Sequence, residues 1–192
     1  MTRQGFYFDM KACVGCRTCQ VACKDKNDLP IGISFRHVDT YETGSYPSAG
    51  FYNVSLSCNH CEDPACIAVC PNGANYVDEE DGTVQYDVSK CIGCMYCVDA
   101  CPYHAKHFFE DELVTKKCDA CIELRAAGEQ TACVSSCPMR ALNFGSIDAL
   151  RTTYPDAVDN IAALVDPSET SPSLAITARP SALESNFVLK PM

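Results

Sequence analysis

Residues 90–103 read KCIGCMYCVDACPY, in which four cysteines follow the spacing C-x2-C-x2-C-x3-C. Two residues between successive cysteines let the backbone curl around a small metal cluster, so that each thiolate reaches a different metal atom. Gly93 precedes the second cysteine, where free access to positive φ lets the backbone approach the cluster. Pro102 follows the fourth cysteine and turns the chain, so that this thiolate can point to a neighbouring cluster. The stretch is therefore typical of an iron–sulfur cluster motif.

All sixteen cysteines of the chain fall into four such groups. Every group begins with an x2 interval and ends with an x3 interval, while the middle interval widens to four residues in the second group and to eleven in the fourth. Pro71 and Pro138 repeat the turning proline, whereas the first group has Lys24 in that place. In chain order the groups are Cys13, Cys16, Cys19 and Cys23; Cys58, Cys61, Cys66 and Cys70; Cys91, Cys94, Cys97 and Cys101; and Cys118, Cys121, Cys133 and Cys137. We expect these groups to hold [4Fe-4S] clusters.

Three other uses of clustered cysteines fit the pattern less well. A disulfide scaffold is disfavoured because closely spaced pairs cannot all form bridges and because no secretory signal is visible before Cys13. Structural zinc uses C-x2-C pairs but has no use for further cysteines at x2 and x3 followed by proline. The C-x3-C-x2-C run of radical S-adenosylmethionine enzymes does not occur in the sequence.

The chain is acidic, with 25 Asp and Glu against 15 Lys and Arg and a net charge of −10 at pH 7. This balance argues against a nucleic-acid partner, which would need a basic face. The longest apolar stretches, such as residues 161–165, are far shorter than the ~20 residues of a membrane span, so we expect no span in this chain. No Ser–His–acid constellation, phosphate loop or nucleotide fingerprint appears, and we expect no catalytic residues.

Short strands and helices are expected around the cysteine groups. The predicted strands are residues 5–8, 51–57, 75–77, 83–86, 106–109 and 142–144. The predicted helices are residues 18–26, 64–69, 95–101 and 122–127. Asp81-Gly82 is a turn signal and predicts a hairpin between 75–77 and 83–86. The expected fold class is α+β with ferredoxin-like modules.

The order of the groups predicts two modules, one inserted into the other. Residues 52–109 have the size and order of a two-cluster ferredoxin, so residues 1–35 plus 110–150 would form an outer ferredoxin-like module around them. Residues 36–51 would connect the two modules. Residues 151–192 would form a C-terminal extension and tail, since residues 166–192 are rich in proline and serine without a helical or strand period. Such a tail is either a disordered end or a strap on a partner subunit.

Three stretches carry a resemblance to a known family: LSCNHCEDPACIAVCPNGA (56–74), KCIGCMYCVDACPY (90–103) and KCDACIELRAAGEQTACVSSCPMRALNFG (117–145). With the order and intervals of the groups, they closely resemble the iron–sulfur (beta) subunit of dimethyl sulfoxide reductase and related molybdopterin oxidoreductases. The resemblance implies crossed ligation, in which three cysteines of one group and the last cysteine of its partner group hold each cluster. The implied sets are site 1, Cys13, Cys16, Cys19 and Cys137; site 2, Cys58, Cys61, Cys66 and Cys101; site 3, Cys91, Cys94, Cys97 and Cys70; and site 4, Cys118, Cys121, Cys133 and Cys23.

The resemblance also implies a function and partners. The chain would be a non-catalytic subunit that relays electrons through four [4Fe-4S] clusters between a large molybdenum or tungsten bis-pterin catalytic subunit and a quinone-linked or other redox partner, in some complexes through a membrane anchor subunit. Since all sixteen positions are cysteine, no [3Fe-4S] cluster is expected. The alternative is a polyferredoxin that serves a hydrogenase or an aldehyde- or oxoacid-oxidising complex. Location stays open between association with a membrane through partners and the cytoplasm, as do the substrate, the direction of electron flow and the cluster potentials.

Two kinds of polar residue lie beside the cysteines. His60 stands between two of them, and we expect it to form hydrogen bonds or to pack, because four thiolates already complete a cluster. Arg17, Lys24, Lys116 and Lys117 also adjoin cysteines, where they either raise nearby reduction potentials by their charge or are solvated surface residues.

Four clusters predict about sixteen irons and about sixteen acid-labile sulfides per chain. Metal and sulfide analysis of the anaerobically purified protein measures both numbers. Zinc at about four per chain with little iron would instead support structural zinc sites.

Overall fold

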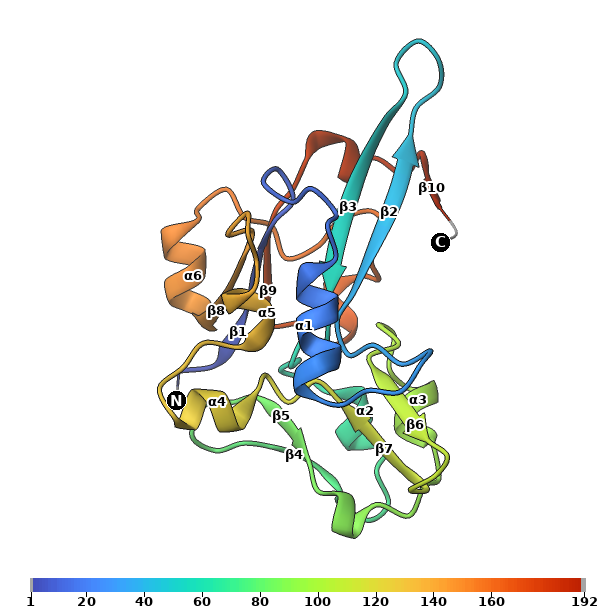
Figure 1. Ribbon diagram of the computed structural model, residues 1–192, viewed down its shortest axis with the longest axis vertical. Helices are drawn as coiled ribbons and strands as arrows, with labels where there is room; N and C mark the ends of the chain where they lie inside the picture. The colour runs from blue at the N-terminus through green and yellow to red at the C-terminus, as the bar shows by residue number, and fades with distance from the viewer. Residues whose placement is uncertain (1, 191–192) are drawn as a thin grey trace.

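Two three-stranded sheets and two hairpins make up the fold of residues 2–190, which the computed structural model describes. The sheets form the upper part of Figure 1, and the hairpins lie below them. The strands are β1 Gln4–Asp9, β2 His37–Thr43, β3 Gly50–Leu56, β4 Asn75–Val77, β5 Val84–Tyr86, β6 Lys106–Phe109, β7 Val114–Lys117, β8 Leu142–Ser146, β9 Leu174–Thr177 and β10 Phe187–Leu189. The α-helices are α1 Thr18–Lys26, α2 Ala65–Ala68, α3 Tyr96–Asp99, α4 Ile122–Ala126, α5 Ala132–Ser135 and α6 Ile147–Thr153, and 3-10 helices span Val88–Lys90, Pro167–Glu169 and Pro180–Ala182.

The first sheet has the order β8-β1-β9. β1 runs antiparallel to β8, with Phe6 opposite Phe144, and its four central residues are buried because neighbours cover it on both sides. The predicted strands 5–8 and 142–144 are thus confirmed. The first cysteine group follows β1 and the fourth precedes β8. Because the two strands are antiparallel, both groups lie at the same end of this strand pair. Helices α1 and α5, which carry cysteines of these two groups, pack against each other.

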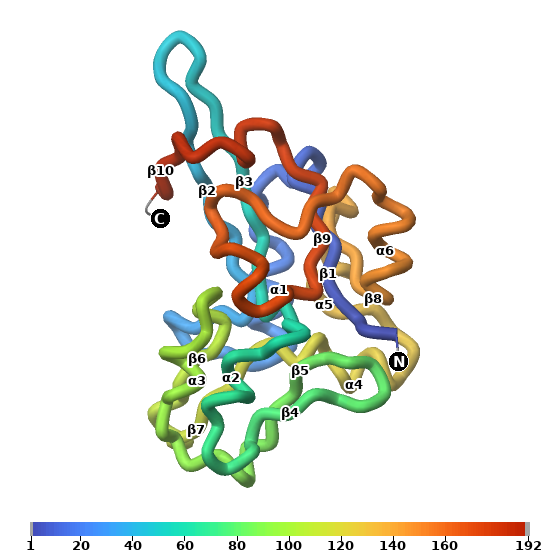
Figure 2. The backbone as a smooth tube through the Cα atoms, turned by 180° about the vertical axis from the view of Figure 1, so that it is seen from behind, coloured from blue at the N-terminus to red at the C-terminus, as the bar shows by residue number. Residues whose placement is uncertain are grey.

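Leu174, Ile176 and Ala182 belong to the hydrophobic core, so the expectation of an extended tail over residues 166–192 was wrong for this stretch. Residues 191–192 of the expected tail lie outside the described residues. β9 pairs in parallel with β1, and its residues Leu174, Ala175 and Ile176 are buried. Figure 2 shows the C-terminal segment passing beside β1 and ending near β2. A strand that is buried on both faces has no alternation of polar and apolar residues, which is why no strand period was visible.

The second sheet has the order β10-β2-β3 and is antiparallel throughout. β2 lies within residues 36–51, which we expected to be only a connection. The hairpin of β2 and β3 projects from the rest of the molecule in Figures 1 and 2, and Tyr46 near its tip is 94% exposed.

The lower part contains the two hairpins and most of the short helices. β4 and β5 pair as predicted, with Val77 opposite Val84 and Gly82 at φ 69° in the turn. β6 pairs with β7, a strand that the sequence pattern did not reveal. All four predicted helices are present, although α2, α3 and α4 are shorter than expected, and α5 and α6 were missed. No helix within residues 2–190 is long and apolar enough to cross a bilayer.

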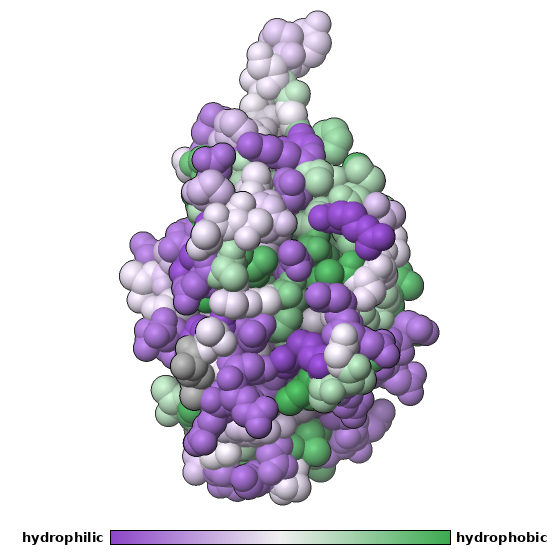
Figure 3. All heavy atoms as spheres, turned by 90° about the vertical axis from the view of Figure 1, so that its left-hand side faces the viewer, coloured by the Kyte–Doolittle hydropathy of each residue, from purple (hydrophilic) through white to green (hydrophobic). Residues whose placement is uncertain are grey.

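Cysteine, aromatic and aliphatic side chains together form the main core. Phe6 contacts Phe144 with ring centroids 4.7 Å apart, and the core continues from these rings toward the cysteines. The buried cysteines in this core are Cys19, Cys23, Cys58, Cys118, Cys133 and Cys137. Hydrophilic side chains cover much of the face drawn in Figure 3, in keeping with the acidic composition.

The buried position of β9 predicts that Ile176→Ala lowers the free energy of unfolding by about 2–5 kcal/mol, because the change removes buried methyl groups and leaves a cavity. Ile31 is fully exposed and provides the matched control, and Ile31→Ala should change stability by less than about 0.5 kcal/mol. Anaerobic denaturant unfolding of the two variants measures the difference as a shift of the midpoint. Equal midpoints would contradict the assignment of β9 to the core.

Candidate metal-cluster sites

The four cysteine groups share one backbone feature in the loop around the second cysteine. The residue just before that cysteine has positive φ at Gly15 (70°), His60 (45°), Gly93 (68°) and Ala120 (55°). Glycine at two of these positions was the signal in the sequence; the other two adopt the conformation with a side chain. At His60 the strained peptide is held by its carbonyl oxygen, which accepts hydrogen bonds from Arg3 Nη1 at 3.2 Å and Ser173 Oγ at 2.9 Å.

The last cysteine of each group accepts a hydrogen bond from a residue four positions later. In the three groups with a turning proline, the donor is a backbone N–H: Ala74 to Cys70 Sγ at 3.2 Å, Ala105 to Cys101 Sγ at 3.5 Å and Ala141 to Cys137 Sγ at 3.3 Å. Without a proline, helix α1 continues past Cys23, and the Asn27 backbone N–H donates to the Cys23 carbonyl instead. The Asn27 side-chain amide lies 3.7 Å from Cys23 Sγ. Donors to sulfur stabilise a thiolate, so these contacts favour metal ligation.

Three small cavities each have four cysteines in their walls. The first is lined by Cys13, Cys16, Cys19 and Cys137; the second by Cys58, Cys61, Cys66 and Cys101; and the third by Cys70, Cys91, Cys94 and Cys97. Each cavity therefore combines three cysteines of one group with the last cysteine of another. These combinations are the same as the expected sites 1, 2 and 3.

The remaining four cysteines, Cys23, Cys118, Cys121 and Cys133, are all buried. Burial raises the pKa of the Cys23 thiol to about 12; nearby Arg36 opposes the rise, and the neighbouring Cys133 and Cys121 add to it. The pKa of Cys118 is raised well above its usual value by burial and by the proximity of Cys23. Cys23 of the first group thus lies beside the three cysteines of the fourth, as expected for site 4.

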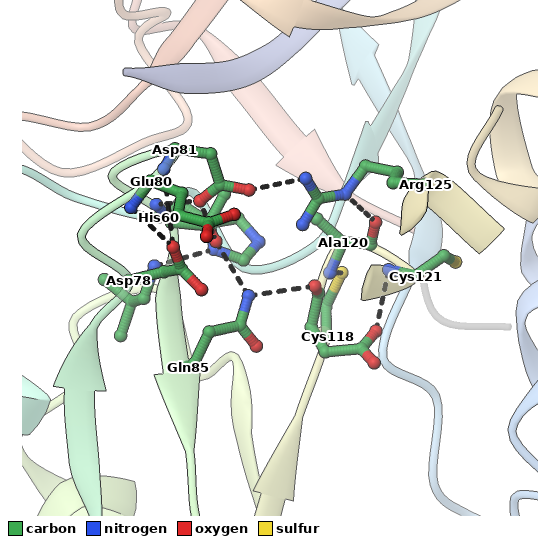
Figure 4. Close-up of polar contacts among 12 residues, drawn as sticks. His60, Asp78, Glu80, Asp81, Gln85, Cys118, Ala120, Cys121 and Arg125 are labelled. Carbon is green, nitrogen blue, oxygen red and sulfur yellow. Dashed lines mark hydrogen bonds and ion pairs between the residues drawn. The ribbon is translucent and has the colours of Figure 1, made fainter. Parts of the chain in front are cut away.

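Hydrogen bonds fix the loop that carries the fourth group, as Figure 4 shows. The Ala120 N–H lies 3.4 Å from Cys118 Sγ, and Arg125 Nε donates to the Ala120 carbonyl at 2.8 Å. Arg125 Nη1 also pairs with Asp81 at 2.5 Å, which ties the loop to the β4–β5 turn.

His60 is neutral and takes part in hydrogen bonding, as expected. It is fully buried, and its Nδ1 accepts a hydrogen bond from the Val84 N–H at 3.1 Å. Burial and the positive charges of Lys117 and Arg125 hold its pKa well below the usual value. A neutral imidazole with Nδ1 as acceptor carries its proton on Nε2.

The residues present fit thiolate-ligated clusters. All sixteen cysteines lie in the described part of the chain, where none forms a disulfide. Burial raises the pKa of several of their thiols, among them Cys61 to about 12 and Cys66 to about 11, so metal binding rather than the protein environment would have to deprotonate them. Buried cations, among them Arg36, whose Nε has no hydrogen-bond partner, also point to an anionic neighbour.

The sequence pattern left the position of one buried cation near the cysteines open and missed two others. For Lys117 we expected either an effect on nearby reduction potentials or a solvated surface position. Its side chain is 1% exposed, so the surface position is excluded. Arg36 and Lys106 are buried as well, and no motif marked them, since lysine and arginine side chains usually face solvent.

Comparisons with known proteins identify 4Fe-4S domains in this chain. The family model of a 4Fe-4S dicluster domain matches residues 50–147, and that of a 4Fe-4S binding domain matches residues 10–26. An anaerobic dimethyl sulfoxide reductase polypeptide of Escherichia coli strain K12 is 41% identical over 99% of this chain and 98% of its own length.

Two further relatives come from other enzymes. The thiosulfate reductase electron transfer subunit of Salmonella typhi is 48% identical over 73% of this chain and 74% of its own length. A sulfite dehydrogenase subunit of Allochromatium vinosum is 36% identical over 77% of this chain and 70% of its own length. The chain therefore belongs to the iron–sulfur subunits of the dimethyl sulfoxide reductase family of molybdopterin oxidoreductases.

Proposed function

We propose that this chain relays electrons through four [4Fe-4S] clusters, one at each of sites 1 to 4, between a large molybdenum or tungsten bis-pterin subunit and a quinone-linked or other redox partner. As a member of its family, the chain is a non-catalytic electron-transfer subunit of an oxidoreductase complex. A [4Fe-4S] cluster takes up and releases one electron, and the protein supplies its ligands, its hydrogen bonds and its degree of burial. The observation that carries the proposal is the gathering of cysteines in sets of four around separate cavities.

Crossed ligation at all four sites is part of this proposal. It is supported by the walls of the three cavities, each of which joins two cysteine groups, and by the proximity of Cys23 to Cys133. The pairing of β1 with β8 and the packing of α1 on α5 support an outer ferredoxin-like module, residues 1–35 and 110–150, around an inner module of residues 52–109.

The order of the relay follows from which cysteines neighbour one another. Cys19 of site 1 is close enough to Cys133 of site 4 for their charges to interact, and Cys118 of site 4 is similarly close to Cys58 of site 2. Lys106 interacts with cysteines of both site 2 and site 3. The sites therefore form the series 1, 4, 2, 3.

Electrons would enter and leave at the two ends of this series. Cys16 of site 1 and Cys94 of site 3 are the exposed cysteines of the described residues, and Val14 and Ile92, two positions before them, are each 60% exposed. We place the catalytic subunit at the site 1 end, on the outer module, and the second redox partner at the site 3 end. That partner could be a membrane anchor subunit, which would associate the complex with a membrane.

The polyferredoxin alternative is not favoured. A match along nearly the whole length of a dimethyl sulfoxide reductase polypeptide is expected for a subunit of a molybdopterin enzyme.

Crossed ligation predicts which cysteine variants resemble one another. Cys101→Ser should alter the same cluster signal as Cys66→Ser, because both cysteines would hold the site 2 cluster, whereas Cys97→Ser should alter another signal. Electron paramagnetic resonance of the three reduced variants compares them directly. If Cys101→Ser instead matched Cys97→Ser, each cluster would be held by cysteines of a single group.

The partner assignment predicts that a tagged form of this chain, purified anaerobically from its own organism, brings with it about one large subunit that contains molybdenum or tungsten and pterin. Metal and pterin analysis of the purified complex identifies this subunit. Recovery of a hydrogenase or a flavin-containing complex without pterin would support the polyferredoxin alternative instead.

A further inference from the structure

Three positively charged side chains are buried among the cysteine sets. Arg36 and Lys117 are each 1% exposed, and Lys106 is 3% exposed. None of the ion pairs found within residues 2–190 includes any of the three. A buried cation is stable only beside compensating charge or strong acceptors, so the surroundings of these three side chains must supply one or the other.

Arg36 lies between sites 1 and 4. Its guanidinium donates to the Ser55 carbonyl and to Ser55 Oγ, both at 3.2 Å, and to Ser57 Oγ at 2.8 Å. Ser55 Oγ is in turn 3.4 Å from Cys19 Sγ of site 1. The charge of Arg36 also interacts with Cys133 and with the other site 4 cysteines Cys118 and Cys23.

Lys117 lies between sites 4 and 2. Its ammonium donates to the carbonyl of Cys118, a site 4 residue, at 2.8 Å and to the Val84 carbonyl at 2.5 Å. The same side chain forms part of the wall of the site 2 cavity, where its charge interacts with Cys66 and Cys101.

Lys106 lies between sites 2 and 3. It is also in the wall of the site 2 cavity, and its ammonium donates to Asn75 Oδ1. Asn75 lines the site 3 cavity, and its amide donates to the Cys66 carbonyl at 3.0 Å. Lys106 is the cross-strand partner of Lys117 in the β6–β7 hairpin, an arrangement of like charges that is unfavourable unless anions lie nearby.

We propose that Arg36, Lys117 and Lys106, one in each gap of the series, offset the negative charge of the clusters and raise the reduction potentials of the two clusters beside each of them. The proposal rests on the proposed function, since it requires clusters at the four sites. Four thiolates around a core of charge about +2 leave about −2 per cluster, and each one-electron reduction adds a further negative charge.

The distribution of the three cations matches the burial of the sites. Sites 4 and 2, in the middle of the series, each adjoin two of the cations, whereas the end sites 1 and 3, which have an exposed cysteine each, adjoin one. Burial disfavours the added charge of reduction, so the middle clusters need more compensation than the end clusters.

The test uses Lys106→Met in the assembled complex, with Lys116→Met as the matched control. Lys116 is the residue just before Lys117, but it lies outside the cluster region and pairs with Glu112 at 2.5 Å. Iron analysis first establishes that clusters are present, and a redox titration followed by electron paramagnetic resonance then measures each couple.

In Lys106→Met the reduction equilibrium constants of two clusters should fall about tenfold, equivalent to about 59 mV for a one-electron couple. Lys106→Arg should keep them near the wild-type values, and Lys116→Met should change them by less than about threefold.

Full iron content with unchanged potentials in Lys106→Met would overturn the proposal. If Lys106→Met lost iron, retention of iron by Lys106→Arg would show that the positive charge is what holds the anionic cluster, while loss in both variants would show that only the shape of lysine matters and would overturn it. Absence of iron from the wild-type complex would instead overturn the proposed function.

Discussion

The fold of this chain depends on bringing cysteine thiols together in sets of four. The walls of three cavities each combine cysteines of two groups, which in one cavity are as far apart in the sequence as Cys13 and Cys137. Regular elements are short because the backbone must curl around every site. The positive φ of the residue before each second cysteine is part of this curl. The cysteine-bearing loops lie between the strands of the sheets and hairpins, which hold the loops in place.

The cysteine requirement also determines where charge can lie. An acidic chain would ordinarily place its few cations at the surface, yet Arg36, Lys106 and Lys117 are buried without carboxylate partners among the described residues. Thiolate-ligated clusters would be anions in the interior, and these cations adjoin the cysteines that would hold them. In the interior, buried cations would therefore face anionic clusters, whereas the composition of the chain as a whole is acidic.

Much of the architecture could be predicted from sequence because cysteine spacing and turn chemistry are local signals. The α1 helix, the β4–β5 hairpin and the positive φ of Gly15 and Gly93 all follow from residues within a few positions of one another. Features that depend on distant contacts were missed. β9 is recognisable as a strand only beside β1, and Lys106 is recognisable as buried only once the cysteine sets surround it.

The parallel pairing of β9 with β1 has a consequence for how the protein is made. Residues 174–177 leave the ribosome after all four cysteine groups, whereas β1 leaves it before them, so the sheet β8-β1-β9 is still incomplete when the last cysteine has been synthesised. Contacts of such wide sequence separation form slowly, because loop closure must precede them. β1 thus has one unpaired edge until β9 has been synthesised, and all sixteen cysteines are present in the chain before this sheet is complete.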